Sequence, residues 1–180
     1  MSGHSKWSTI RPKKAIVDSK RSAVFTKIAK KIQIAAKQGN SGNPDLNATL
    51  RTILDEARSV NMPNDNIKKA IDKGLGVGGE QVIEIVYEGY GPGGIGIMIT
   101  CATDNRNRTG TEIRTLLEKH GGSLAGPGAV SYMLAMNPVP TLKLDDDTQA
   151  KAIEVLDLLD DHDDVMDLWT NLEHSDDQTS

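Results

Sequence analysis

The stretch from residue 82 to residue 103 decides the fold: Val82-Ile-Glu-Ile-Val-Tyr-Glu88, then Gly89-Tyr-Gly-Pro-Gly-Gly94, then Ile95-Gly-Ile-Met-Ile-Thr-Cys-Ala-Thr103. Its first and last parts are rich in β-branched and other apolar residues, which favour strands. Its middle part is dense in glycine and proline, which favour turns. Two apolar runs on either side of such a turn predict a β-hairpin, so a sheet is expected in this part of the chain.

Upstream of the hairpin the apolar residues recur every three or four positions, which predicts helices. The first contains Phe25 to Ala36, the second runs from about Pro44 to Val60, and the third from about Pro63 to Lys73. Gly74-Leu-Gly-Val-Gly-Gly79 follows, and four glycines in six residues are typical of a linker. We therefore expect a helical domain over residues 1–76.

Downstream of the hairpin two helices alternate with two strands. Helices are predicted from about Arg108 to His120 and from Ala150 to Leu159, and strands at Ala129–Leu134 and Val165–Leu172. The resulting order is β-β-α-β-α-β. The predicted class is α+β: an N-terminal three-helix domain, then an α/β sandwich over residues 80–180, with helices covering one face of a mostly antiparallel sheet.

The charge is divided between the two halves of the chain. The 180 residues have a formal net charge of −4, but residues 1–80 carry 15 Lys and Arg against 7 Asp and Glu, and residues 81–180 carry 6 against 18. Within residues 1–40 the only acidic residue is Asp18. Such asymmetry indicates a basic nucleic-acid-binding module joined to an acidic one.

The single cysteine and the hydropathy pattern limit the class of protein further. Cys101 excludes an internal disulfide and any multi-cysteine metal site, and its place in a predicted central strand is typical of a core residue. No apolar run is long enough for a transmembrane helix, and residues 1–7 hold no apolar secretion segment. We expect a cytoplasmic protein with no membrane partner.

The motifs that could indicate catalysis or cofactor binding are better explained here as structural features without a chemical role. Two G-x-G-x-x-G patterns occur, at Gly74/Gly76/Gly79 and Gly89/Gly91/Gly94, but neither lies between a strand and a helix as a dinucleotide site requires. The acidic run Asp160-Asp-His-Asp-Asp164 lacks the spacing of a calcium loop and is interpreted as a solvated loop. We expect no enzyme activity, no cofactor and no metal.

The basic arm and first helix supply the candidate nucleic-acid-binding residues. A solvated helix face would explain Lys27, Lys30 and Lys31, but not the near absence of acids over forty residues, so phosphate binding is favoured. Trp7 would stack on a base or anchor the arm. The candidates are Lys6, Trp7, Arg11, Lys13, Lys14, Lys20, Arg21, Lys27, Lys30, Lys31 and Lys37.

A second candidate lies in Asp104-Asn-Arg-Asn-Arg-Thr109, where the hairpin meets a helix. Backbone N–H groups together with Arg106 and Arg108 could bind a phosphate there. Alternatively the segment is a capping loop, with Asn107 or Thr109 capping the helix and Asp104 pairing with an arginine. The residues alone leave both interpretations open.

Several of these segments resemble the signature segments of the YebC/PmpR family, which is related to the mitochondrial translational activator of cytochrome c oxidase subunit one. They are Gly3-His-Ser-Lys-Trp7, Phe25-Thr-Lys27, Tyr87-Glu-Gly-Tyr-Gly-Pro-Gly-Gly94, Asp104-Asn-Arg-Asn-Arg-Thr109 and Gly121-Gly122. The resemblance implies a helical domain followed by an α/β domain into which family members usually insert a third. Residues 135–141 leave no room for that insertion, so the third domain is expected to be absent.

The resemblance also implies a function without a catalytic mechanism. Family members are described as DNA-binding transcriptional regulators and as ribosome-associated translation factors that relieve stalling, notably at proline runs. Our leading hypothesis is a factor whose basic domain binds ribosomal RNA, near the catalytic centre as the resemblance suggests. The alternative is a transcriptional regulator on duplex DNA. A protein-interaction module whose basic arm meets an acidic partner, or its own acidic domain, is a third interpretation.

Overall fold

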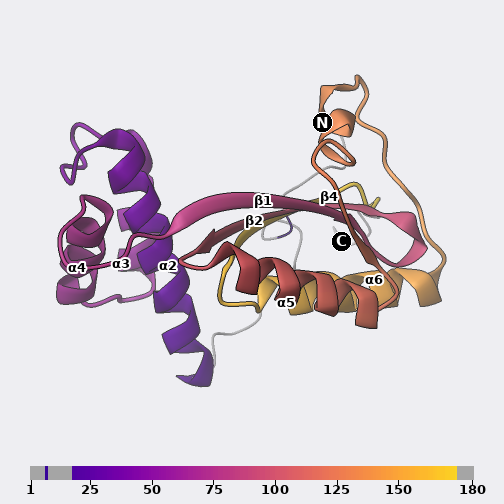
Figure 1. Cartoon of the computed structure of the whole chain (residues 1–180), viewed down its shortest axis with the longest axis horizontal. Coiled ribbons are helices and arrows are strands. Elements are labelled where there is room, and N and C mark those ends of the chain that lie inside the picture. Colours follow the sequence, from indigo (N-terminus) through magenta and orange to yellow (C-terminus); the bar gives the residue numbers. More distant parts are fainter. Residues whose placement is uncertain (1–6, 8–17, 174–180) are drawn as a thin grey trace, which may run out of the picture. The chain divides into compact units, whose positions relative to one another are not determined.

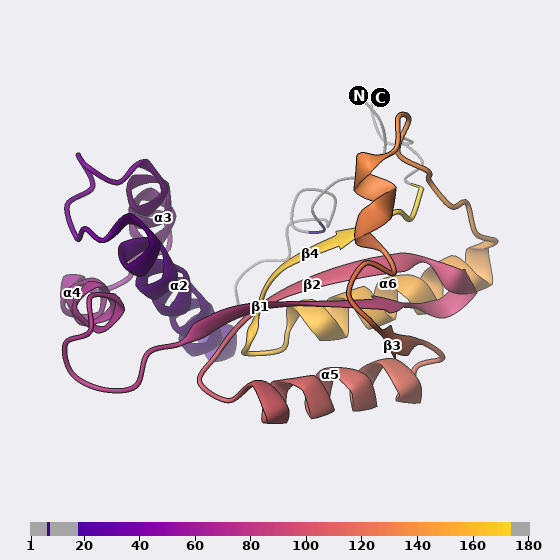
Figure 2. The same ribbon diagram turned by 45° about the horizontal axis from the view of Figure 1, so that its top comes forward.

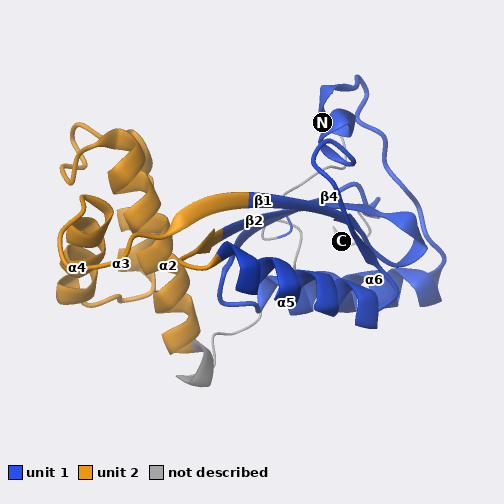
Figure 3. Ribbon diagram, in the orientation of Figure 1, with its two compact units in different colours: residues 1–13, 86–101, 106–180 blue, residues 14–85, 102–105 orange. Residues whose placement is uncertain are grey.

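The computed structural model describes Trp7 and residues 18–173, with residues 18–20 as backbone alone. The described residues form two compact units, shown in two colours in Figure 3. One holds residues 18–85 together with 102–105, and the other holds Trp7, residues 86–101 and residues 106–173. The domain ranges expected from the sequence, 1–76 and 80–180, stay a prediction.

Within the described residues the N-terminal region is helical, as predicted. It contains α2 (Asp18–Gly39), α3 (Ala48–Ser59) and α4 (Asn64–Gly74), and α2 packs against the other two (Figure 1). Each helix turns its apolar stripe toward a shared core, whose burial is the main stabilising term for such short helices. The core residues are Ile28, Ile32, Ala35, Leu50, Leu54, Ala57, Met62 and Ala70.

Asn47 decides where α3 begins. The sequence pattern predicted a start near Pro44, but the helix begins at Ala48 because the Asn47 side chain caps it. Asn47 Oδ1 accepts the N–H of Leu50 at 3.0 Å, while its Nδ2 donates to the carbonyl of Ala35 in α2 at 2.9 Å. One buried side-chain amide thus accepts a backbone N–H at the start of α3 and also links α3 to α2 by a hydrogen bond.

The last residue of α4, Gly74, allows α4 to pack closely on α2. A Cβ at this position would overlap the backbone oxygen and Cα of Gln33. The two helices therefore meet backbone to backbone near Gln33, which only a residue without a side chain permits.

The sheet has the strand order β3-β1-β2-β4 in the described residues. Strands β1 (Ile83–Tyr90) and β2 (Gly96–Thr103) form the predicted hairpin around η1 (Pro92–Gly94), where Gly93 and Gly94 have positive φ of 74° and 81°. Strand β3 (Ser123–Ala125) pairs antiparallel with β1, and β4 (Val165–Thr170) pairs antiparallel with β2. The turn glycines supply the backbone conformation that joins the strands.

Two helices cover one face of this sheet. Helices α5 (Arg106–Lys119) and α6 (Asp146–Asp160) lie on the same side of the strands in both views (Figures 1 and 2). Along β2 the side chains of Ile97, Ile99 and Cys101 are fully buried, whereas Met98 and Thr100 between them are half-buried. This alternation is that of a strand with one face in the core, and it confirms the expected α+β class and the buried Cys101.

The predicted third strand is wrong in its position. Residues Ala129–Leu134 were expected to form it, but Ser131–Ala135 is the 3-10 helix η2, and the strand is Ser123–Ala125. The buried carboxylate of Glu88 in β1 takes the N–H groups of Gly128, Val130 and Ser131 at 2.9, 2.7 and 2.8 Å. These N–H groups therefore pair with a side chain instead of a neighbouring strand.

No helix of the described residues has the length and apolar character that crossing a bilayer would require.

Candidate nucleic-acid interface

The structure places the side chains of eight of the thirteen predicted binding residues. Lys6, Arg11, Lys13 and Lys14 lie outside the described residues, and the side chain of Lys20 is not described. Arg21 and four lysines lie along α2. Arg106 and Arg108 lie at the start of α5, and Trp7 lies in the same unit as α5. The lysines of α2 are Lys27, Lys30, Lys31 and Lys37.

The lysines of α2 differ in what they contact. Lys31 pairs with Glu56 of α3, with Nζ and Oε1 3.1 Å apart, and its side chain is only 24% exposed. Lys37 lies exposed in the last turn, where a cation also favours the helix dipole. To bind a phosphate, Lys31 would first have to leave Glu56, whereas Lys37 is presented to solvent. The pair itself is of the kind worth about 0–1 kcal/mol.

Trp7 is buried, with 2% of its surface exposed. Of the two roles expected for it, stacking on a base and anchoring the arm, only anchoring is compatible with a ring enclosed by protein. Stacking would need this residue to leave its site, exposing a large apolar ring to water.

A groove between α2 and α4 supplies cations that the sequence interpretation missed. Its volume is about 580 Å³, and Arg21 from α2 lines it together with Lys69 and Lys73 from α4. Asn66 adds a polar group, and no Asp or Glu is among the described residues of the lining. The groove is thus positively charged on both of its helices.

The signal for this groove was present in the sequence as two stripes. Arg21, Phe25, Ala29 and Gln33 recur every four residues on α2 and share one helix face. On α4, residues 66, 69 and 73 are spaced by three and four residues and also share a face. Periodicity marks each stripe as a face. It does not reveal that the two faces meet, because that depends on the packing of α4 against α2 near Gly74.

The start of α5 is tied to the protein itself. Helix α5 begins at Arg106, so Asn107 and Thr109 lie inside it and the expected cap by either residue is wrong. Arg108 Nη2 lies 3.1 Å from Oδ2 of the buried Asp164, and the hydroxyl of Thr109 donates to that same oxygen at 2.7 Å. Arg108 therefore pairs with Asp164, which makes it a structural group in this conformation. Arg106 remains exposed.

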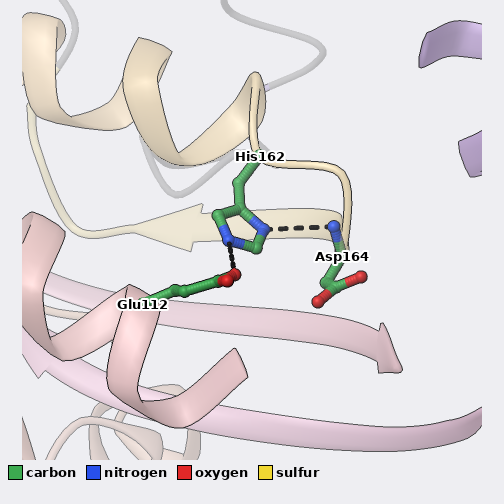
Figure 4. A group of neighbouring side chains, drawn as sticks. All are labelled: Glu112, His162 and Asp164. Atoms are coloured by element: carbon green, nitrogen blue, oxygen red, sulfur yellow. Dashed lines mark hydrogen bonds and ion pairs between the residues drawn. The ribbon is translucent and has the colours of Figure 1, made fainter. Parts of the chain in front are cut away.

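The acidic run at residues 160–164 is not simply a solvated loop, because Asp164 is only 4% exposed. Glu112, His162 and Asp164 offer oxygen and nitrogen atoms within 4.8 Å of one another, a separation that a metal ion could bridge (Figure 4). However, His162 Nδ1 accepts the N–H of Asp164 at 3.1 Å, so the proton sits on Nε2, which contacts Glu112 Oε2 at 2.8 Å. With both ring nitrogens occupied, the cluster is explained as a hydrogen-bonded junction between α5 and the start of β4.

Sequence models of one family match most of the chain. Residues 5–77 match the TACO1/YebC protein N-terminal domain, and residues 82–135 match the TACO1/YebC second and third domain. The second match ends at residue 135, where residues 135–141 are expected to take the place of the inserted third domain. That this chain lacks the third domain stays a prediction.

Curated relatives and a solved structure agree with these matches. A probable transcriptional regulatory protein of Chloroflexus aurantiacus is 52% identical over 80% of this chain and 58% of its own length. One from Lactiplantibacillus plantarum is 44% identical over 95% of this chain and 73% of its own length. The chain thus spans less than two thirds of the Chloroflexus relative.

The solved structure is that of a conserved hypothetical protein from Aquifex aeolicus. It superposes with a TM-score of 0.82 and 30% identity, covering 96% of this chain and 99% of its own. Agreement in sequence and in fold over nearly the whole described chain leads to one conclusion: the chain belongs to the TACO1/YebC family.

Proposed function

We propose that this chain is a non-enzymatic regulatory factor that binds nucleic acid, and that its target is ribosomal RNA on a translating ribosome. In this proposal its N-terminal helices neutralise RNA phosphates and its binding helps elongation through sequences that stall. The membership of the TACO1/YebC family and the regulatory names of its relatives support the broader part of the proposal.

The observation that carries the proposal is the concentration of cations on the N-terminal helices. Residues 1–80 hold 15 of the 21 Lys and Arg residues of the chain. Arg21, Lys69 and Lys73 converge on one groove, and Lys27 and Lys37 lie elsewhere on α2. Each phosphate that such a group neutralises releases a counterion, which supplies most of the binding free energy for a polyanion.

The acidic second half of the chain supports the same proposal. With 18 Asp and Glu against 6 Lys and Arg in residues 81–180, this half is repelled by an RNA backbone. Repulsion at one end and attraction at the other orient the protein on the ribosome, with its basic helices toward the RNA.

Neutralising Lys27 and Lys30 tests the proposal. Replacing both with Gln removes two cations of α2 and leaves Lys31 in its pair with Glu56. The matched control replaces Lys119 and Lys151, two exposed lysines of the acidic half, with Gln. Co-sedimentation with ribosomes is measured between about 50 and 200 mM salt, the range over which phosphate contacts are most evident.

Loss of two phosphate contacts is expected to lower the slope of log affinity against log salt by about 1.4. The control variant should keep the wild-type slope. Ribosome binding that is indifferent to salt, or weakened equally in both variants, would contradict the proposal.

A transcriptional regulator on duplex DNA is the second candidate, and the names of the relatives favour it. It predicts protection of a defined DNA sequence in footprinting, with base contacts made by a helix in the major groove. Crosslinking in cells followed by sequencing separates the two candidates. Promoter fragments without ribosomal RNA would establish the regulator, and ribosomal RNA fragments would exclude it as the main role.

A further inference from the structure

We propose that the groove between α2 and α4 is a site for an unpaired RNA nucleotide, which places the base against the apolar floor and the phosphates on the basic rim. The inference rests on the proposed function in one respect, the choice of RNA as the polyanion. It adds a specific site and a specific form of the ligand, namely single-stranded and unstacked.

The size and shape of the groove suit a nucleotide. Its volume of about 580 Å³ lies within the usual range for small-ligand sites. Residues 21 and 33, at its two ends on α2, are twelve residues apart, which corresponds to about 18 Å of helix. A duplex presents no base faces to such a groove, whereas an unpaired strand can insert one.

Charge is placed along the groove as a phosphate backbone requires. Gly74 of α4 touches the backbone of Gln33, so Lys73 lies toward the Gln33 end, and Lys69 lies one turn further along α4. Arg21 lies at the other end of the α2 stripe. Cations at both ends, with no acidic side chain among the described lining residues, match a ligand that carries several negative charges.

The floor between these cations is apolar. Phe25, Ala29, Met62 and Ala70 line it, which provides an aromatic ring and a thioether beside a flat ligand. Bases stack on aromatic side chains with about 1–3 kcal/mol per base in proteins that bind single strands. An acidic peptide would match the basic residues of the groove, but its carboxylate side chains would offer no flat ring to pack on the apolar floor.

The wall holds an unsatisfied amide. Gln33 lines the groove with 8% of its surface exposed, and its Oε1 is buried with no hydrogen-bond partner among the described residues. A turn of the last side-chain torsion, which has a broad two-fold profile, exchanges the amide oxygen and nitrogen. Every nucleobase carries an N–H group on its pairing edge, and that group would satisfy the oxygen once the amide has turned.

The experiment measures three probes by fluorescence anisotropy with the full chain: a labelled single-stranded RNA, the same RNA as a duplex, and inorganic polyphosphate. Gln33→Leu removes the amide and keeps the side-chain size. Lys69→Gln with Lys73→Gln removes two rim cations. Lys68→Gln is the matched control, because Lys68 is exposed on α4 but does not line the groove.

The site predicts a different response for each variant. Gln33→Leu should weaken single-stranded RNA about threefold to tenfold, the worth of one hydrogen bond, and leave polyphosphate unchanged. The double lysine variant should weaken both probes and lower the salt slope by about 1.4. Gln33→Leu should unfold at the same or higher denaturant concentration than wild type, since it removes an unsatisfied buried acceptor, so weaker binding would not reflect misfolding.

The outcomes separate this inference from the proposed function. If the groove variants bind single-stranded RNA like wild type while Lys27→Gln with Lys30→Gln weakens it, the groove site is wrong and the proposed function stands. If the wild-type chain binds no RNA, both fall. If polyglutamate displaces the RNA and binds Gln33→Leu more weakly than wild type, the groove is a peptide site and the inference is overturned. Tighter binding of the duplex than of the single-stranded RNA would also overturn it.

Discussion

The Glu88 carboxylate is expected to stabilise the unit that holds residues 86–101 and 106–173, and Glu88→Gln measures by how much. Glu88 is 8% exposed; its Oε2 accepts the N–H groups of Val130 and Ser131, and its Oε1 accepts that of Gly128. A glutamine can keep its oxygen where Oε2 lies. Its NH₂ group must then face the Gly128 N–H, so one hydrogen bond is lost and two donors oppose each other.

The expected loss is about 2–3 kcal/mol of unfolding free energy. Hydrogen bonds to a charged acceptor are worth about 1.5–3 kcal/mol each, and a stranded donor adds about 1–3 kcal/mol where it is fully buried. The Gly128 N–H is only part-buried, which keeps the sum toward the lower figure. Since 1 kcal/mol shifts the melting temperature of a unit of roughly 100 residues by about 4–8 °C, the loss should also be clear in a thermal scan.

The pH dependence gives a second, independent signature. Burial by itself would raise the pKa of Glu88, but the hydrogen bonds from Gly128, Ser131 and Val130 outweigh it and hold the pKa below the usual glutamate value. A lowered folded-state pKa stabilises the fold above the unfolded pKa of about 4.3, and this contribution is lost as the pH falls through the folded-state pKa. The difference between wild type and Glu88→Gln should therefore be full at pH 7 and shrink in acid.

Urea unfolding followed by tryptophan fluorescence is the assay. Both tryptophans, Trp7 and Trp169, belong to the same unit as Glu88, so their emission follows the unit under test. Glu118→Gln, at an exposed glutamate of α5 in the same unit, is the control and should leave the midpoint unchanged. Equal stability of wild type and Glu88→Gln at pH 7, or a difference that does not shrink in acid, would refute the reasoning.

Two further substitutions test the helical unit. Gly74→Ala introduces a Cβ that overlaps the backbone of α2, so it should cost about 1–3 kcal/mol in urea unfolding followed by circular dichroism, whereas Gly126→Ala, with open space around it, should be neutral; equal effects would contradict the close packing. Glu56→Gln releases Lys31 from its ion pair, so RNA affinity should rise in the anisotropy assay while stability changes by less than about 1 kcal/mol. Unchanged or weaker RNA binding would show that Lys31 does not contact the ligand.

The hairpin and the helices were predictable because their signals are local. In residues 82–103 two apolar runs flank a glycine-rich turn, and in the helices the apolar residues recur every three or four positions. Both patterns can be read from residues that are close together in the sequence. The third strand failed for the opposite reason. Ala129–Leu134 has strand composition, but Glu88, some forty residues earlier, takes its N–H groups.

The candidate interface divides in the same way. The cations of α2 could be identified from composition, because the near absence of acidic residues around them is visible in the sequence alone. Lys69, Lys73 and Gln33 could not be assigned to a common site, since their stripes converge only where Gly74 brings α4 onto α2. For Arg108 the residues alone left phosphate binding and a structural role both open, and only the structure shows its pairing with the buried Asp164, fifty-six residues away.

The sequence by itself determined the fold class, the family resemblance and the division of charge, because periodicity, motifs and net charge are properties of neighbouring residues or of sums over them. Tertiary structure decided which cations form a groove, which are held in internal pairs, and that Trp7 is buried. Those outcomes depend on which faces pack together. Packing is settled by close contacts between distant segments, such as Gly74 against Gln33 and Glu88 against residues 128–131.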